Sequence, residues 1–368
     1  MKLEVRPPAA GTDFDGTRLT VARRLRAKTK AALAREVGVT PTAIGQFEKG
    51  KAYPTQPVLN KLCLNLGLPR EFFGAGRPLT LLPANDAHFR SLRSTSASSR
   101  EQALAYGEVC LEVVDLISNY IDLPPVRLPD VQLSDDVTDS EIEEAAAATR
   151  DLWELGNGPI ASVVQSIEAN GIIALRLPPT TDRAVDAFST YASDRPLVFL
   201  SPTKNDRARS RFDAAHELGH LVLHPDTEPG SKLVENQAHR FASELLMPRH
   251  EILGQLPRRI DWPRLHELKR HWGVSLRALV FRSHALGVIS EASYRRANQQ
   301  LSLWGLPEPG DLGPAESPQL LGLARDLLAD NGVDFQALLA AARIDNDITA
   351  DVIAAGSAPR LKLNLSAG

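Results

Sequence analysis

Two histidines four residues apart, His216 and His220, enclose Glu217. On a helix this spacing puts both imidazole rings on one face, where they can hold one zinc ion at roughly 2.0–2.1 Å per nitrogen. Glu217 lies about 100° further around the helix than His216. It can therefore act as a general base toward water at the ion without being a ligand. The stretch 207–224 is thus predicted to be one helix that carries a metal site.

A chance match on a solvated helix face is the alternative interpretation. The flanking positions argue against it, because they are apolar or small: Phe212, Ala215, Gly219, Val222 and Leu223. A helix that is apolar nearly all round is buried, and buried histidine and glutamate side chains need partners. A shared metal ion supplies such partners, so the sequence favours a zinc hydrolase.

A catalytic zinc ion normally has three protein ligands and one open position. His224 is two helical turns beyond His216, roughly 11–12 Å away, which is too far to share the ion. A second helix is predicted over 232–247, and it carries two candidates one turn apart, Glu235 and His239. Glu235 is preferred, since two histidines and one carboxylate form a known catalytic set.

The stretches R-S-R-F-D-A-A-H-E-L-G-H-L-V-L-H-P and E-N-Q-A-H-R-F-A-S-E-L-L-M-P resemble the ImmA/IrrE family of zinc metallopeptidases. Segments 152–160 and 171–175 are similar too, so the resemblance covers roughly residues 88–300. The site residues it implies are the zinc ligands His216, His220 and Glu235 and the catalytic base Glu217. It also implies a cytoplasmic enzyme that cleaves repressor proteins and so switches genes on. Position 239 departs from the family, whose members more often have Asn there.

The N-terminal part carries a second pattern. Residues 16–77 show five short helical stretches, with Thr40 as cap and Pro41 in the first turn of the third. With L-A-R-E-V-G-V in the second stretch and F-E-K-G-K after the third, residues 17–75 resemble the phage-repressor (Xre-like) helix-turn-helix domain. In that fold the third helix enters the major groove of DNA.

The DNA contacts that this resemblance implies are base contacts from Thr42, Ala43 and Gln46 and phosphate contacts from Lys30, Lys49 and Lys51. Gln46 is the preferred direct reader, because a glutamine can pair bidentately with adenine. Residues 16–77 hold twelve Lys and Arg against three Glu, on a chain with a net charge of −3. The alternative is a scaffold used only for dimerisation or for holding a protein partner.

The chain is predicted to be an α+β protein, mostly α. Its expected regions are a disordered arm (1–15), a helix-turn-helix domain (16–77), a linker with a long helix (78–145), a zinc peptidase domain (146–304) and a C-terminal helical region (305–368). The long helix is expected to begin at Ser99, with Gln102 completing a capping box. The acidic run 130–144 is interpreted as a solvated linker and helix start, with competition for the basic N-terminal domain as the alternative.

Three β-like stretches, 172–177, 185–191 and 197–200, predict a small sheet before the metal helix. The strand at 187–191 is expected to hold a substrate as an added extended strand. Tyr191 either stabilises an oxyanion there or is simply packed. The corner Gly273-Val-Ser, which also resembles a helix-turn-helix, is expected to pack behind the peptidase core.

With 43% hydrophobic residues the chain can build real cores. Cys63 and Cys110 form no paired motif, and neither a signal peptide nor a membrane span is apparent, so we expect a cytoplasmic protein. The leading hypothesis is a DNA-binding zinc endopeptidase that cleaves a repressor, reaching its operator through residues 16–77. The alternatives are a regulator whose zinc site is structural or sensing, and an antitoxin-type regulator. A homodimer is an open alternative as well.

Overall fold

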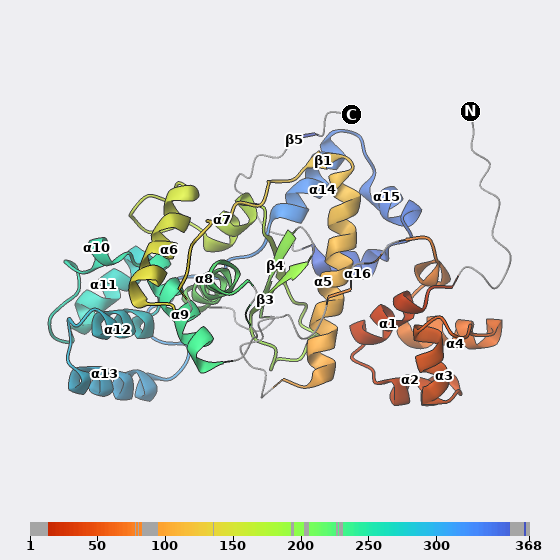
Figure 1. Ribbon diagram of the computed structural model, residues 1–368, viewed down its shortest axis with the longest axis horizontal. Helices are drawn as coiled ribbons and strands as arrows, with labels where there is room; N and C mark the ends of the chain where they lie inside the picture. The colour runs from red at the N-terminus through yellow and green to blue at the C-terminus, as the bar shows by residue number, and fades with distance from the viewer. Residues whose placement is uncertain are drawn as a thin grey trace.

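The computed structural model describes residues 14–77, 79, 81–82, 95–134, 136–192, 195–201, 206–225, 227, 231–353 and 364–365. Figure 1 shows the N-terminal helical domain at one end of the molecule and the helices that follow the sheet at the other. A long central helix and the C-terminal helices lie between these ends. The expected fold class, α+β and mostly α, is confirmed.

The N-terminal domain consists of α1 (Gly16–Leu25), α2 (Lys30–Val37), α3 (Pro41–Glu48), α4 (Gln56–Leu66) and the 3-10 helix η1 (Arg70–Phe73). The hydroxyls of Thr29 and Thr40 cap α2 and α3 by accepting backbone N–H groups three residues on. Gly38 ends α2 with a φ of 78°, which a side chain disfavours. The five predicted helices are therefore present, with a 3-10 turn as the fifth.

The arm expected over 1–15 lies mostly outside the described residues. Its last two residues are described and are folded. Phe14 forms a β-bridge with Gly74, and its ring stacks on Phe73 at 6.3 Å. Asp15 caps α1. The expected boundary at residue 15 is therefore wrong by two residues, because the aromatic ring has an apolar surface to pack against.

The central helix α5 (Ala97–Ser118) does not begin where the sequence suggested. The Ser96 hydroxyl accepts the N–H of Ser99, so Ser96 is the cap. Gln102 donates instead to the carbonyl of Leu25 in α1. The expected start at Ser99 and its capping box are wrong, because a contact with another helix uses the Gln102 side chain.

Buried ion pairs anchor the N-terminal domain to α5. Arg18 donates to both carboxylate oxygens of Glu112, at 2.6 and 2.5 Å, and Arg24 donates to Glu108 at 3.1 Å. Glu108 is fully buried, and this burial raises its pKa to about 7. Ion pairs between mostly buried side chains thus hold the N-terminal domain on the central helix.

A mixed sheet lies between α5 and the two helices that carry the candidate metal ligands. Its strands are β2 (Ile173–Arg176), β3 (Phe188–Ala192) and β4 (Arg195–Leu200), in the order β2-β4-β3, with β2 parallel and β3 antiparallel to β4. Alternate side chains face opposite sides. Phe188 and Phe199 stack at 4.2 Å in the core that contains α5, whereas Val198 and Leu200 belong to the core on the other side. The predicted three-stranded sheet is confirmed.

Eight helices surround the far side of the sheet in the described part of the chain. They are α6 (Asp139–Leu152), α7 (Val163–Ala169), α8 (Arg207–Leu223), α9 (Lys232–Leu246), α10 (Arg249–Ile252), α11 (Trp262–Trp272), α12 (Leu276–Ala285) and α13 (Glu291–Trp304). Helix α12, after the corner at Gly273, is buried over most of its surface, and its Arg282 pairs with Glu244 of α9. This burial agrees with packing behind the core, although Arg277 and Ala285 stay exposed.

Residues 139–144 of the acidic run form the start of α6. Thr138 and Glu141 cap that helix reciprocally. Asp139 pairs with Arg240 of α9, at the surface. Among the described residues, two members of the run thus pair with basic residues of the same half, Asp139 with Arg240 and Glu143 with Arg249, as the interpretation as a solvated linker and helix start expects.

The C-terminal region contains α14 (Leu320–Asp330), α15 (Phe335–Ala341) and α16 (Asn346–Val352), while β5 (Asn364–Leu365) pairs with β1 (Ile121–Asp122) after α5. Buried carboxylates join this region to the rest. Glu316 pairs with Arg211 of α8 at 2.5 Å, and Glu168 of α7 accepts the N–H of Leu320. Burial raises the pKa of Glu168 to about 8. Residues 305–353 therefore pack on the body of the protein.

None of the described helices is both long and apolar enough to cross a membrane.

Candidate metal centre and nucleic-acid interface

Helices α8 and α9 pack against each other closely. Asp206 caps α8 by accepting the N–H of Arg209, and Ser231 caps α9 in the same way. Gly219 of α8 makes the close approach possible. A Cβ at this position would lie 3.0 Å from the Phe241 ring and 3.2 Å from backbone atoms of Ala238. The glycine within the histidine motif therefore sets how near the second helix comes.

Three predicted ligands converge between these helices. The Nε2 atoms of His216 and His220 are 3.2 Å apart, and the Glu235 carboxylate oxygens lie 3.3 Å and 3.6 Å from them. Donor atoms around a tetrahedral zinc ion are about 3.3 Å apart for bonds of about 2.0 Å. The donor set and its spacing therefore fit zinc. The Glu235 side chain keeps 22% exposure, which leaves the site open on that side.

Glu217 is fully buried beside this cluster. The Ser189 hydroxyl of β3 donates to Glu217 Oε2 at 3.0 Å and lies 3.2 Å from its backbone oxygen. Sequence reasoning missed Ser189. The only available signal was strand alternation, because Phe188 faces the α5 side and the next residue must therefore face α8.

His224 and Gln237 form a line of contacts behind the cluster. His220 Nδ1 is 3.2 Å from His224 Nδ1, and His224 Nε2 is 2.9 Å from Gln237 Oε1. Both side chains are buried. His224 lies outside the converging group, as its distance along the helix predicted, but it contacts His220. Nothing in the sequence pattern pointed to Gln237.

The two remaining candidates lie elsewhere. His239 is outside the converging group, and its ring packs against Phe212 at 4.6 Å and Phe281 at 4.9 Å. The Tyr191 hydroxyl donates to the carbonyl of Leu221 at 2.7 Å, while 38% of the residue stays exposed, so a hydrogen bond and not burial holds this tyrosine. Strand β3, on which Tyr191 lies, is an edge of the three-stranded sheet.

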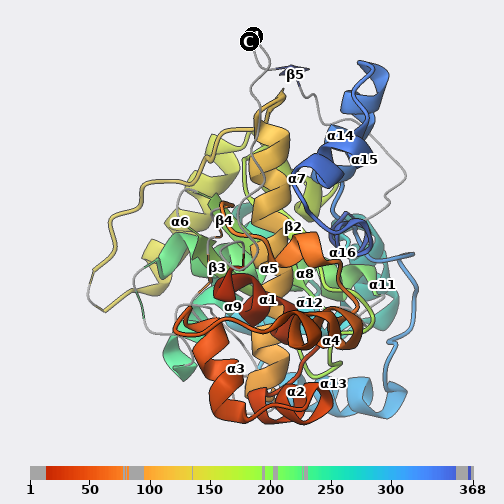
Figure 2. The ribbon, with the colours of Figure 1, turned by 90° about the vertical axis from the view of Figure 1, so that its right-hand side faces the viewer.

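The predicted DNA contacts lie on the surface of α2, α3 and the turn after α3. Figure 2, in which the N-terminal domain faces the viewer, shows these helices along its lower edge. Exposed side chains are those of Lys30, Thr42, Gln46, Lys49 and Lys51, while Ala43 is half-buried. Lys30 differs from the other lysines, because its Nζ lies 3.0 Å from the carboxylate of Glu48.

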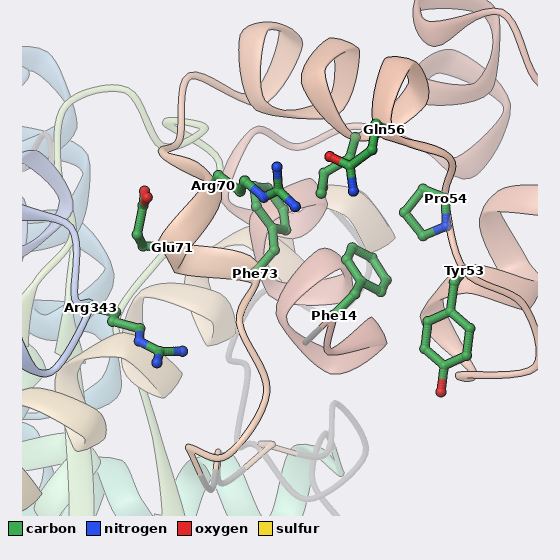
Figure 3. Close-up of a pocket in the computed structure, with 9 residues that line it drawn as sticks. Phe14, Tyr53, Pro54, Gln56, Arg70, Glu71, Phe73 and Arg343 are labelled. Carbon is green, nitrogen blue, oxygen red and sulfur yellow. The ribbon is translucent and has the colours of Figure 1, made fainter. Parts of the chain in front are cut away.

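A hollow of about 230 Å³ lies between the N-terminal domain and the turn before α16. Figure 3 shows Phe14, Phe73 and Arg70 on its wall, with Arg343 reaching in from the C-terminal region. None of the predicted metal or DNA contacts lines it. It therefore belongs to neither candidate site.

Two family models match the chain. Residues 172–284 match the IrrE N-terminal-like domain, a peptidase family, and residues 21–73 match the helix-turn-helix family. No curated protein matches. Among solved structures, PlcR of Bacillus thuringiensis, in complex with the peptide PapR7 and DNA, is 11% identical over 88% of this chain and 98% of that chain, with a TM-score of 0.16. A likeness of that size carries no argument about fold or function.

Proposed function

Because the chain joins a helix-turn-helix domain to an IrrE N-terminal-like peptidase domain, as its motifs predicted, we propose that it is a DNA-binding zinc endopeptidase. Its substrate is a repressor or another regulatory protein, whose cleavage changes transcription. The observation that carries this proposal is the convergence of His216, His220 and Glu235 beside the buried Glu217. A purely structural metal site would have no need of the glutamate.

The metal ligands in this proposal are His216, His220 and Glu235. A bound zinc ion supplies Lewis-acid polarisation of the scissile carbonyl and makes water more acidic. The two helices do the rest of the positioning. Each histidine leaves the same face of α8, and Glu235 enters from the first turn of α9 with both oxygens toward them.

Glu217 is the proposed general base. The Ser189 hydroxyl donates to its Oε2 and so fixes the orientation of the carboxylate. It takes a proton from the attacking water and passes it to the nitrogen of the leaving amine. Burial beneath β3 keeps bulk water away from this carboxylate.

Strand β3 offers a place for the substrate chain. It is the edge of its sheet and lies directly on α8, since Ser189 and Tyr191 both contact that helix. An extended peptide can pair with such an edge through main-chain hydrogen bonds. A substrate bound in this way would run past Glu217.

In the proposal, DNA binding by the N-terminal domain targets the enzyme to its operator. In our proposal α3 lies in the major groove with Thr42, Ala43 and Gln46 over the bases, and Lys30, Lys49 and Lys51 contact phosphates. The exposure of all but Ala43 supports this assignment. Binding at an operator would bring the peptidase close to a repressor on the same DNA.

The test compares wild type with Glu217→Gln. Purified protein is assayed for bound metal and for cleavage of repressors encoded next to its gene. We expect Glu217→Gln to keep its zinc and to lose cleavage by about 10²- to 10⁴-fold, because proton transfer is removed but no ligand is. The matched control is Glu267→Gln, at an exposed position of α11, which should leave both readouts unchanged.

If Glu217→Gln cleaves like wild type, the protease proposal is wrong. The chain would then be a helix-turn-helix regulator with a structural or sensing metal site, or an antitoxin-type regulator. A wild type that binds no metal would reject both zinc proposals.

A further inference from the structure

The ring of His220 has two nitrogen atoms with different surroundings. Its Nε2 faces the other two proposed ligands, 3.2 Å from His216 Nε2. Its Nδ1 faces away, 3.2 Å from His224 Nδ1. A metal-binding imidazole must present a lone pair to the ion, so its proton has to be on the other nitrogen. What fixes that proton is therefore part of the site.

The contacts behind His220 settle the direction of donation. Gln237 Oε1 can only accept, so His224 Nε2 carries the proton of the 2.9 Å contact. In a neutral ring, His224 Nδ1 is then a lone pair. It can only accept, and His220 Nδ1 must donate to it. His220 Nε2 is left with its lone pair, directed at the metal site.

The reverse arrangement is unsuited to a metal. If His224 Nδ1 donated to His220, the neutral His220 ring would carry its proton on Nε2. That proton would point at His216 Nε2 and the Glu235 carboxylate, where the ion has to be. Only the first direction turns the lone pair of His220 Nε2, and not its proton, toward the other two proposed ligand atoms.

We propose that His224 and Gln237 are positioning residues that fix the tautomer and the ring orientation of His220. The proposal rests on the metal site put forward above. In this proposal α9 contributes twice to the site. Glu235, in its first turn, supplies a ligand, and Gln237 holds the ring of His224, which lies behind the proposed ligand His220. Helices α8 and α9 are thereby joined on both sides of His220.

The experiment measures the dissociation constant for Zn²⁺ by competition with a coloured chelator, on the full chain at mildly alkaline pH, where imidazole is neutral. Gln237→Leu and His224→Phe should each weaken binding by about 10- to 100-fold. Gln237→Glu, which keeps an acceptor, should stay within a few-fold of wild type. The control is His250→Phe, another ring substitution, at an exposed position of α10, which should bind like wild type.

Two further measurements separate positioning from loss of structure. The double variant His224→Phe/Gln237→Leu should bind no more weakly than His224→Phe, because residues that act in series are not additive. The visible spectrum of Co²⁺-loaded Gln237→Leu should also differ from wild type, since the ring orientation has changed. Should His224→Phe fail to fold, the Gln237 pair still decides.

Three outcomes would overturn the proposal. Equal Zn²⁺ affinity of wild type, Gln237→Leu and His224→Phe would reject the positioning role alone. Weak binding of Gln237→Glu as well as Gln237→Leu would mean that packing, and not acceptance of the proton, matters at this position. A wild type without affinity for Zn²⁺ would remove the metal site and this role together.

Discussion

Two helices of this protein, α8 and α3, carry its proposed activities. They differ in whether their functional side chains are buried or exposed. In α8, His216, Glu217 and His220 are each at most 1% exposed. In α3 those of Thr42 and Gln46 are exposed. The partner of α8 is another part of the same chain, whereas the proposed partner of α3 is DNA. One site is therefore assembled on folding and the other only on binding.

This difference decides what a substitution does. Around α8, a changed side chain meets packed neighbours, so stability and metal affinity change together. On α3 a changed side chain meets solvent until DNA arrives, so affinity can change while stability stays constant. Three substitutions, with Lys51→Ala as a comparison for the first, test this contrast in order of decreasing expected effect.

The largest effect is expected for Gln46→Ala on DNA binding. Loss of one bidentate base contact costs about 1–3 kcal/mol, roughly a 5- to 150-fold loss of affinity for the preferred site. The probe is a duplex selected from a random library by wild-type protein, and affinity is measured by fluorescence anisotropy. The melting temperature should not change, because the side chain is exposed.

Lys51→Ala provides the comparison for that experiment. A phosphate contact carries no sequence information, so this variant should bind all duplexes more weakly and lower the salt slope by about 0.9. If Gln46→Ala weakens selected and scrambled duplexes equally, Gln46 is not a base reader.

The convergence of the candidate metal ligands was largely predictable because the pattern behind it is local. A spacing of four residues fixes His216 and His220 on one helix face, and the burial of their helix followed from its flanks. The position of Glu235 was harder to predict, because it depends on how the chain between α8 and α9 reverses direction. The preference for a carboxylate over the neighbouring His239 rested on ligand chemistry, and the structure brings Glu235 to the two rings.

The supporting residues were not predictable, because their roles depend on contacts far apart in the sequence. Ser189 reaches Glu217 only through the face that β3 turns to α8, and Gln237 reaches His224 only through the rotation of α9. The start of α5 failed for a related reason, since Gln102 contacts α1 instead of its own helix end. Local patterns located the elements, whereas tertiary contacts assigned these side chains.

The second substitution is Gly219→Ala in the metal helix. The new Cβ would press on the Phe241 ring and on backbone atoms of Ala238, and the backbone cannot move aside without shifting Glu235. Overpacking costs about 1–3 kcal/mol, which outweighs the roughly 1 kcal/mol that alanine gains in a helix. Chemical denaturation should show a net loss of up to about 2 kcal/mol, and Zn²⁺ affinity should fall. Unchanged values for both would mean that the α8–α9 approach is not tight.

The smallest effect, and the one with the opposite sign, is expected for Gly45→Ala in α3. A Cβ at this position meets no atom within 4 Å, and the backbone is that of an ordinary helix. Only the helix propensity remains, so free protein should become more stable by about 1 kcal/mol in the same denaturation experiment. One substitution type, glycine to alanine, thus stabilises the helix that awaits an external partner and destabilises the helix that already has its partner. If Gly45→Ala and Gly219→Ala shift stability in the same direction, the contrast between the two helices does not hold, because packing around α8 would then be as loose as the surface of α3.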